Sequence, residues 1–144
     1  MRQAYLDLQK KQHDEINNFP VAYAFSDEQL ERALEKLGAK SKDECVTVFG
    51  HGDIVKRENA KPFLDMLKRH TQEVKEAMKN KEFAEAAFRY EMDNHEYAIN
   101  WDGDADVLGC FSMDYKELRE MGLEDAYRRA RNGHMKYFEE LGVI

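Results

Sequence analysis

The residues best suited to chemistry in this chain are seven carboxylates that no lysine or arginine accompanies. They are Glu91, Asp93, Glu96, Asp102, Asp104, Asp106 and Asp114. Acidic and basic residues balance on either side of this stretch, so it accounts for the whole formal net charge of −7. Carboxylates in contact repel one another by roughly 1 kcal/mol per pair even in water. The sequence therefore predicts that a bound cation, a basic partner or basic residues from elsewhere in the chain offset them.

A metal site is one chemistry that this stretch could support. His95 follows Glu91 by four residues, so the two would share a helix face, as an ion pair at a helix end or as part of a site. A divalent ion, or the metal centre of a hydrolase, would take Asp93, His95, Glu96 and Asp102 as its ligands. The Asp-x-Asp-x-Asp pattern beginning at residue 102 starts like a calcium-binding loop but lacks the glycine and the final glutamate of that loop.

Alternatively, the acidic stretch could bind a protein partner with a basic surface. The chain would then be a non-catalytic interaction protein with an acidic surface over residues 91–114. The candidate contact residues are Glu91, Asp93, Glu96, Asp102, Asp104 and Asp106. The net negative charge argues against direct binding to nucleic acid, whose phosphates need a basic surface. Arg128, Arg129 and Arg131 form one tight basic cluster. The sequence leaves open whether this cluster neutralises the acidic stretch within the fold or faces a separate acidic partner.

The composition indicates a globular protein and shows no catalytic motif. With 144 residues and 42% hydrophobic residues, the chain suits a single domain over residues 1–144. Cys45 and Cys110 lie far apart, as free thiols in a reducing compartment do. No apolar run could span a membrane and the N-terminus lacks a signal-peptide core, so a cytoplasmic protein is expected. No catalytic residue is assigned, no cofactor is expected beyond the divalent metal considered above, and the oligomeric state stays open.

The hydrophobic pattern predicts an α+β fold. Two β-rich runs at about residues 45–57 flank Gly50-His51-Gly52-Asp53, which is typical of a β-hairpin. A strand at about residues 97–101 would join the hairpin in a small antiparallel sheet, and residues 21–25 are a further candidate strand. Four to six helices would pack on the sheet, with an apolar helix through residues 83–92 at the centre. The capping box Ser26–Gln29 opens another helix, which Gly38 ends.

Several phrases between residues 24 and 106 form a recognisable pattern. They are Phe25-Ser26-x-x-Gln29-Leu30, the two glycines of the predicted hairpin and Phe88-x-Tyr90-Glu91-Met92-x-Asn94-His95-Glu96-Tyr97. The most specific part is Asn94-His95-Glu96-Tyr97. In these phrases the chain resembles a family of uncharacterised small proteins encoded in bacterial genomes, phages and plasmids. The resemblance implies a similar fold and a mobile-element setting. In such a setting an acidic surface would suit an accessory or anti-defence role. The resemblance does not indicate any particular enzymatic activity.

Overall fold

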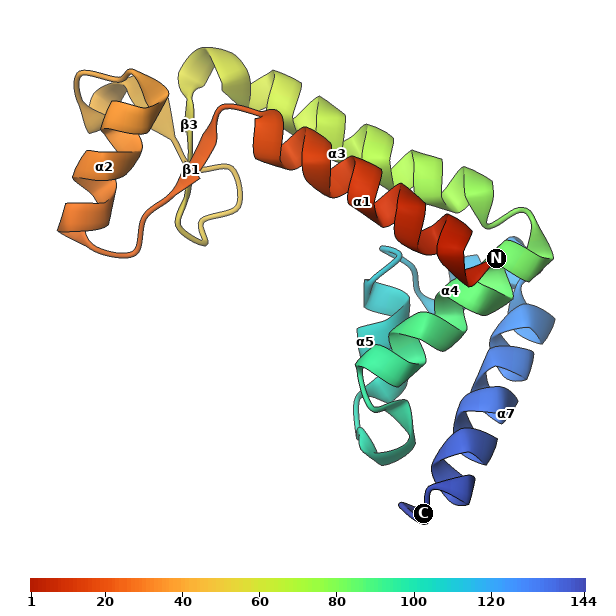
Figure 1. Cartoon of the computed structure of the whole chain (residues 1–144). Coiled ribbons are helices and arrows are strands. Elements are labelled where there is room, and N and C mark those ends of the chain that lie inside the picture. The colour runs from red at the N-terminus through yellow and green to blue at the C-terminus, as the bar shows by residue number, and fades with distance from the viewer. The chain divides into compact units, whose positions relative to one another are not determined.

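In the computed structural model, which describes residues 1–144, the chain forms two compact units. The sheet unit is Lys10–His70, and the helical unit is Met1–Gln9 together with Thr71–Ile144. Helices α1 (Arg2–Asn18) and α3 (Arg57–Ala77) contribute residues to both units. The single domain expected over residues 1–144 stays a prediction. The predicted α+β class is confirmed, with seven α-helices and one three-stranded antiparallel sheet (Figure 1).

The sheet unit is organised around the hairpin predicted at residues 45–57. Strands β2 (Cys45–Val46) and β3 (Asp53–Lys56) pair in antiparallel register. Strand β1 (Val21–Tyr23) pairs with the other edge of β3, which gives the order β1-β3-β2. Because β3 has a neighbour on both edges, Val55 at its centre is fully buried. Helix α2 (Asp27–Leu37) packs beside β1 (Figure 1).

Helix α2 begins and ends where the sequence predicts. The Ser26 hydroxyl accepts a hydrogen bond from the Gln29 N–H at 3.2 Å. The Gln29 side chain in turn accepts one from the Phe25 N–H at 2.7 Å, which completes the predicted capping box. Gly38 ends the helix with a φ of 70°, in the left-handed region that glycine enters without steric cost.

Asp53 holds the loop between β2 and β3 together. Its buried carboxylate accepts hydrogen bonds from the backbone N–H groups of Val48, Phe49 and His51, at distances from 2.6 to 3.3 Å. Burial by itself raises the pKa of this carboxyl, but the backbone donors outweigh that effect and hold the pKa below its usual value. The loop therefore depends on an ionised carboxylate at its base.

Replacing Asp53 with alanine is expected to lower the free energy of unfolding by about 2 kcal/mol, because three backbone N–H groups then lose their acceptor. Urea unfolding followed by circular dichroism measures the loss. Asp43→Ala serves as the control because Asp43 is an exposed carboxylate of the same unit, and its replacement should change the stability by less than about 0.5 kcal/mol. Equal stability of the two variants would contradict this role of Asp53.

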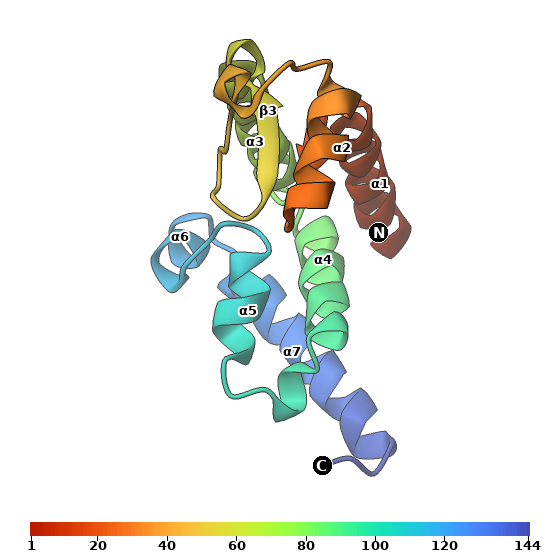
Figure 2. The ribbon, with the colours of Figure 1, turned by 90° about the vertical axis from the view of Figure 1, so that its left-hand side faces the viewer.

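The helical unit is built on α4 (Lys81–Asn94), the helix that the sequence predicts to be central. The Asn80 side chain caps it by accepting hydrogen bonds from the N–H groups of Glu82 and Phe83. Helix α4 packs along α7 (Glu124–Glu140) and against α5 (Gly103–Gly109), as Figures 1 and 2 show. The fully buried ring of Phe88 on α4 lies 5.2 Å from that of Phe111 and 5.0 Å from that of Tyr127. No helix of the structure combines the length and the apolar content that a membrane crossing needs.

Two details of the predicted fold are wrong. Residues 97–101 form no strand, because Tyr97–Ile99 is a 3-10 turn, η2. All three strands lie in the sheet unit, so this alternating segment of the helical unit lacks the neighbouring strands that a stable sheet needs. The seven helices also exceed the predicted four to six, because the residues after 102 fold as three helices. Asp114 caps the middle one, α6 (Tyr115–Glu120), by accepting a hydrogen bond from the Glu117 N–H at 2.8 Å.

Candidate functional site

Most of the carboxylates between residues 91 and 114 bind other groups of the chain. Asp93 lies 3.1 Å from the Arg89 Nε and 2.7 Å from the His134 Nδ1. Asp106 accepts a hydrogen bond from the Asn100 side chain at 2.8 Å. Basic and polar groups of the fold itself therefore offset much of the charge that the sequence leaves unopposed.

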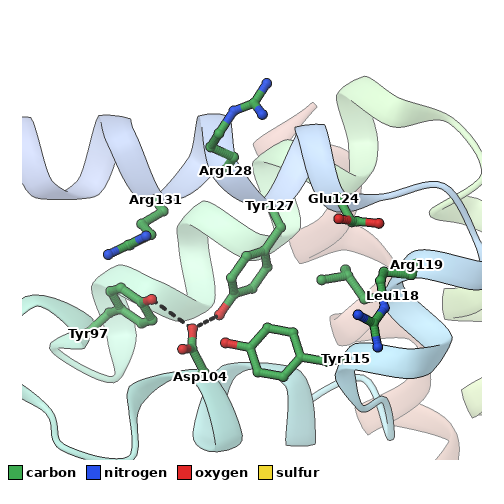
Figure 3. Close-up of a pocket in the computed structure, with 9 residues that line it drawn as sticks. All are labelled: Tyr97, Asp104, Tyr115, Leu118, Arg119, Glu124, Tyr127, Arg128 and Arg131. Carbon is green, nitrogen blue, oxygen red and sulfur yellow. Dashed lines mark hydrogen bonds between the residues drawn. The ribbon is translucent and has the colours of Figure 1, made fainter.

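Asp104 is partly buried and lies in a pocket of about 250 Å³ in the helical unit (Figure 3). The hydroxyls of Tyr97 and Tyr127 donate to the same carboxylate oxygen at 2.7 and 2.5 Å. The Tyr115 hydroxyl also faces the carboxylate, as Figure 3 shows. These four residues come from η2, α5, α6 and α7, so four elements of the unit meet at one carboxylate.

The Asp104 carboxyl and the three tyrosine hydroxyls around it have pKa values that lie away from neutral pH. Burial by itself raises the pKa of Asp104, but the tyrosine hydroxyls and the Arg131 charge hold it below its usual value. Burial and the neighbouring Asp104 carboxylate raise the pKa of Tyr97 and Tyr115 to about 12, and they raise that of Tyr127 as well. A general acid or base needs a pKa near the working pH, so this arrangement suits structure rather than proton transfer.

Arg128, Arg129 and Arg131, the basic cluster of the sequence, differ in their contact with the acidic stretch. Arg131 lines the pocket, and its charge favours the ionised form of Asp104. Arg128 also lines the pocket and forms an ion pair with Asp125 at 2.7 Å. Arg129 is exposed and does not line it. Of the three arginines, Arg131 is thus the one that helps to neutralise the acidic stretch within the fold.

His134 is a site residue that the sequence analysis did not single out. It is fully buried, and its Nε2 accepts a hydrogen bond from the Ala98 N–H at 3.0 Å. The ring proton therefore lies on Nδ1, which donates to Asp93. Because both nitrogens are engaged, the imidazole fixes η2 to α7 and is not free to act as a base. The one signal in the sequence is its position on the apolar stripe of the last helix.

Glu91, His95 and Cys110 form a second cluster in the helical unit. The His95 Nε2 lies 3.6 Å from the nearer carboxylate oxygen of Glu91 and 3.3 Å from the Cys110 Sγ. One ligand atom from each residue lies within 4.8 Å of the other two. The contact of His95 with Glu91 is the helix-end pair that their spacing favours. Among the residues predicted as metal ligands, the structure brings no three together, since Asp93 binds His134 while Glu96 and Asp102 are exposed.

The segment of residues 96–102, called here the 96–102 loop, carries exposed apolar and acidic side chains side by side in the sequence. Trp101, the one tryptophan of the chain, is fully exposed, and Ile99 is 54% exposed. Glu96 and Asp102 are exposed carboxylates at the two ends of the loop. Asn100 holds the loop by donating to the His95 carbonyl oxygen at 3.1 Å and accepting from the Asp102 N–H at 2.9 Å. An ordered loop thus carries an indole with no packing partner.

Comparison with known protein families finds one match. A family model described as a family of unknown function, DUF7659, matches residues 4–132. The chain belongs to this family. The part that matches DUF7659 includes the Asp104 pocket, the 96–102 loop and the cluster of Glu91, His95 and Cys110. No curated protein and no solved structure matches the chain. The mobile-element setting implied by the resemblance stays a prediction.

Proposed function

We propose that this DUF7659 protein is a non-catalytic interaction protein whose 96–102 loop binds a partner with a basic surface. The full exposure of Trp101 carries this proposal. Tryptophan is among the residues most enriched where binding energy concentrates at interfaces, because one ring buries a large area with little loss of rotamer freedom. Ile99, which is also more than half exposed, adds apolar surface in the same loop.

The charge around the loop favours a basic partner over an acidic one. Glu96 and Asp102 are exposed and have no hydrogen bond or ion pair through their side chains. No lysine or arginine occurs between residues 91 and 114. Exposed charges of one sign mainly raise the association rate and select the partner, while burial of the apolar side chains supplies affinity. Within the acidic surface expected over residues 91–114, we therefore propose that the 96–102 loop contacts the partner.

A non-catalytic role agrees with the protonation chemistry of the helical unit. Asp104 and its tyrosines keep one protonation state around neutral pH, and both ring nitrogens of His134 are engaged. The alternative of a metal-dependent hydrolase centred on Asp93, His95, Glu96 and Asp102 has less support. The carboxylate of Asp93 is bound to Arg89 and His134, so using it as a metal ligand would break an existing network.

The proposal is tested by calorimetric titration with two synthetic peptides of equal length, each with two apolar side chains. The charged residues of the basic peptide are lysines and arginines, and those of the acidic peptide are glutamates. Binding of the basic peptide alone is expected, with an affinity that falls as salt rises. Trp101→Ala should weaken it by about 30-fold, which corresponds to about 2 kcal/mol. Charge reversal at Glu96 and Asp102 should weaken binding and reduce its salt dependence.

The matched control is Phe25→Ala, because Phe25 is a 75% exposed aromatic residue of the sheet unit. It should leave the affinity for the basic peptide unchanged. Equal binding by Trp101→Ala and the unaltered protein, or equal binding of the basic and acidic peptides, would refute the proposal.

A further inference from the structure

We propose that Glu91, His95 and Cys110 form a binding site for a divalent transition-metal ion of the zinc type. Thiolate, imidazole and carboxylate are the three side-chain groups that bind zinc in proteins, and one of each is present. The site shares only His95 with the ligand set predicted from the sequence. It contains no residue of the 96–102 loop, so it is independent of the proposed partner binding.

The distances between the ligand atoms fit a tetrahedral ion. Bonds of about 2.3 Å to sulfur and about 2.0–2.1 Å to nitrogen or oxygen place neighbouring ligand atoms about 3.4–3.6 Å apart. The corresponding separations are 3.3 Å between the Cys110 Sγ and the His95 Nε2, and 3.6 Å between that nitrogen and the Glu91 oxygen. The three side chains could therefore bind an ion with only small movements.

The backbone holds the three residues in place. Glu91 and His95 lie one turn apart at the end of α4, so their side chains share a face. Cys110 ends α5, which packs against α4, and its N–H hydrogen-bonds to the carbonyl oxygens of Asp106 and Val107. Two packed helices thus bring together ligands that lie far apart in the sequence.

The buried Glu91 is the second observation that favours a cation. Its side chain is only 6% exposed, and its one ion-pair partner is His95. A buried carboxylate is costly unless a positive charge compensates it. The Tyr5 hydroxyl lies close enough to Glu91 to interact with its carboxylate electrostatically. Polar neighbours of carboxylate ligands are common in the outer shell of metal sites.

The cluster is accessible from solvent. Binding of a divalent ion to the Cys110 thiol would displace the thiol proton to the solvent and form the sulfur–metal bond. Cys110 is exposed and the His95 side chain is 33% exposed, which gives an ion access and leaves the fourth position to water.

Titration with Co²⁺ alone tests the site, because Co²⁺ takes zinc ligands and is coloured. The full chain, freed of metal with EDTA, is expected to bind one Co²⁺ with a thiolate-to-cobalt charge-transfer band that Zn²⁺ then abolishes. Cys110→Ser should remove the band and weaken Zn²⁺ binding by about 100-fold or more. The control Cys45→Ser, which replaces the other free thiol in the sheet unit, should keep the band.

Glu91→Gln provides a second variant that keeps the shape of the side chain. It should retain the charge-transfer band but bind Co²⁺ about tenfold more weakly, and circular dichroism verifies that each variant is folded. The absence of the band in the unaltered protein would overturn the proposal. A band that survives in Cys110→Ser or vanishes in Cys45→Ser would place the ion elsewhere and would overturn it as well. Unchanged metal binding in Trp101→Ala would show that the two proposals succeed or fail separately.

Discussion

Replacing Asp104 with alanine is expected to lower the free energy of unfolding of the helical unit by about 3 kcal/mol. The carboxylate accepts hydrogen bonds from Tyr97 and Tyr127, and its removal leaves their hydroxyls without this acceptor. Because the two hydroxyls share one carboxylate oxygen, the loss should be smaller than the sum of two separate charged hydrogen bonds. Urea unfolding followed by circular dichroism measures it.

Asp102→Ala is the matched control for this experiment, because Asp102 is an exposed carboxylate two residues away with no side-chain cap on α5. Its replacement should change the stability by less than about 0.5 kcal/mol. Equal losses in the two variants would show that Asp104 does not hold the four elements together.

The contribution of Asp104 should also depend on pH in a defined direction. Its pKa is lower in the folded protein than the value of about 3.9 expected in the unfolded chain. The unfolded chain therefore takes up the proton first as the pH falls, so the stabilisation is complete above about pH 4 and is lost towards the lower folded pKa. Thermal melts across this range should show a steeper acid loss for the unaltered protein than for Asp104→Ala. Parallel pH profiles would contradict the lowered pKa.

The largest single loss of stability is expected for Phe88→Ala, at about 4 kcal/mol. Phe88 is fully buried on α4, and its ring meets those of Phe111 and Tyr127 edge to face, so truncation removes buried area and leaves a cavity. Phe88→Leu fills part of the cavity and should cost clearly less. Urea unfolding of the two variants beside Phe25→Ala, which lies on the surface, gives the comparison. A loss no greater than that of Phe25→Ala would place Phe88 outside the core.

The parts of the fold that the sequence predicts correctly are those with local signals. The capping box at Ser26 and Gln29 and the glycine at residue 38 set the ends of α2 without help from other elements. The glycines around His51 similarly mark the hairpin turn. The apolar spacing of residues 83–92 gives the central helix of the helical unit. In each case residues close in sequence make the decisive contacts.

The parts that the sequence could not predict depend on contacts between distant residues. Residues 97–101 alternate like a strand, but Tyr97 is held by Asp104 as part of a 3-10 turn, and no strand of its own unit lies beside it. The need to offset the acidic stretch follows from the sequence, and the contact of His95 with Glu91 follows from their spacing. No pattern of sequence spacing predicts that Asp104 lies beside tyrosines of three other elements. The contact of Cys110 with His95 likewise depends on the packing of α5 on α4, which the sequence does not predict.

The fluorescence of Trp101 tests the central claim most directly, because it is the one tryptophan in the chain and lies in the proposed binding loop. The free protein should show the emission of a solvated indole, readily quenched by acrylamide. Addition of the basic peptide at low salt should shift the emission to shorter wavelengths and protect the indole from acrylamide, and high salt should diminish both effects. Unchanged emission and quenching under conditions where calorimetry detects peptide binding would show that the peptide binds elsewhere, and the 96–102 loop would not be the interaction site.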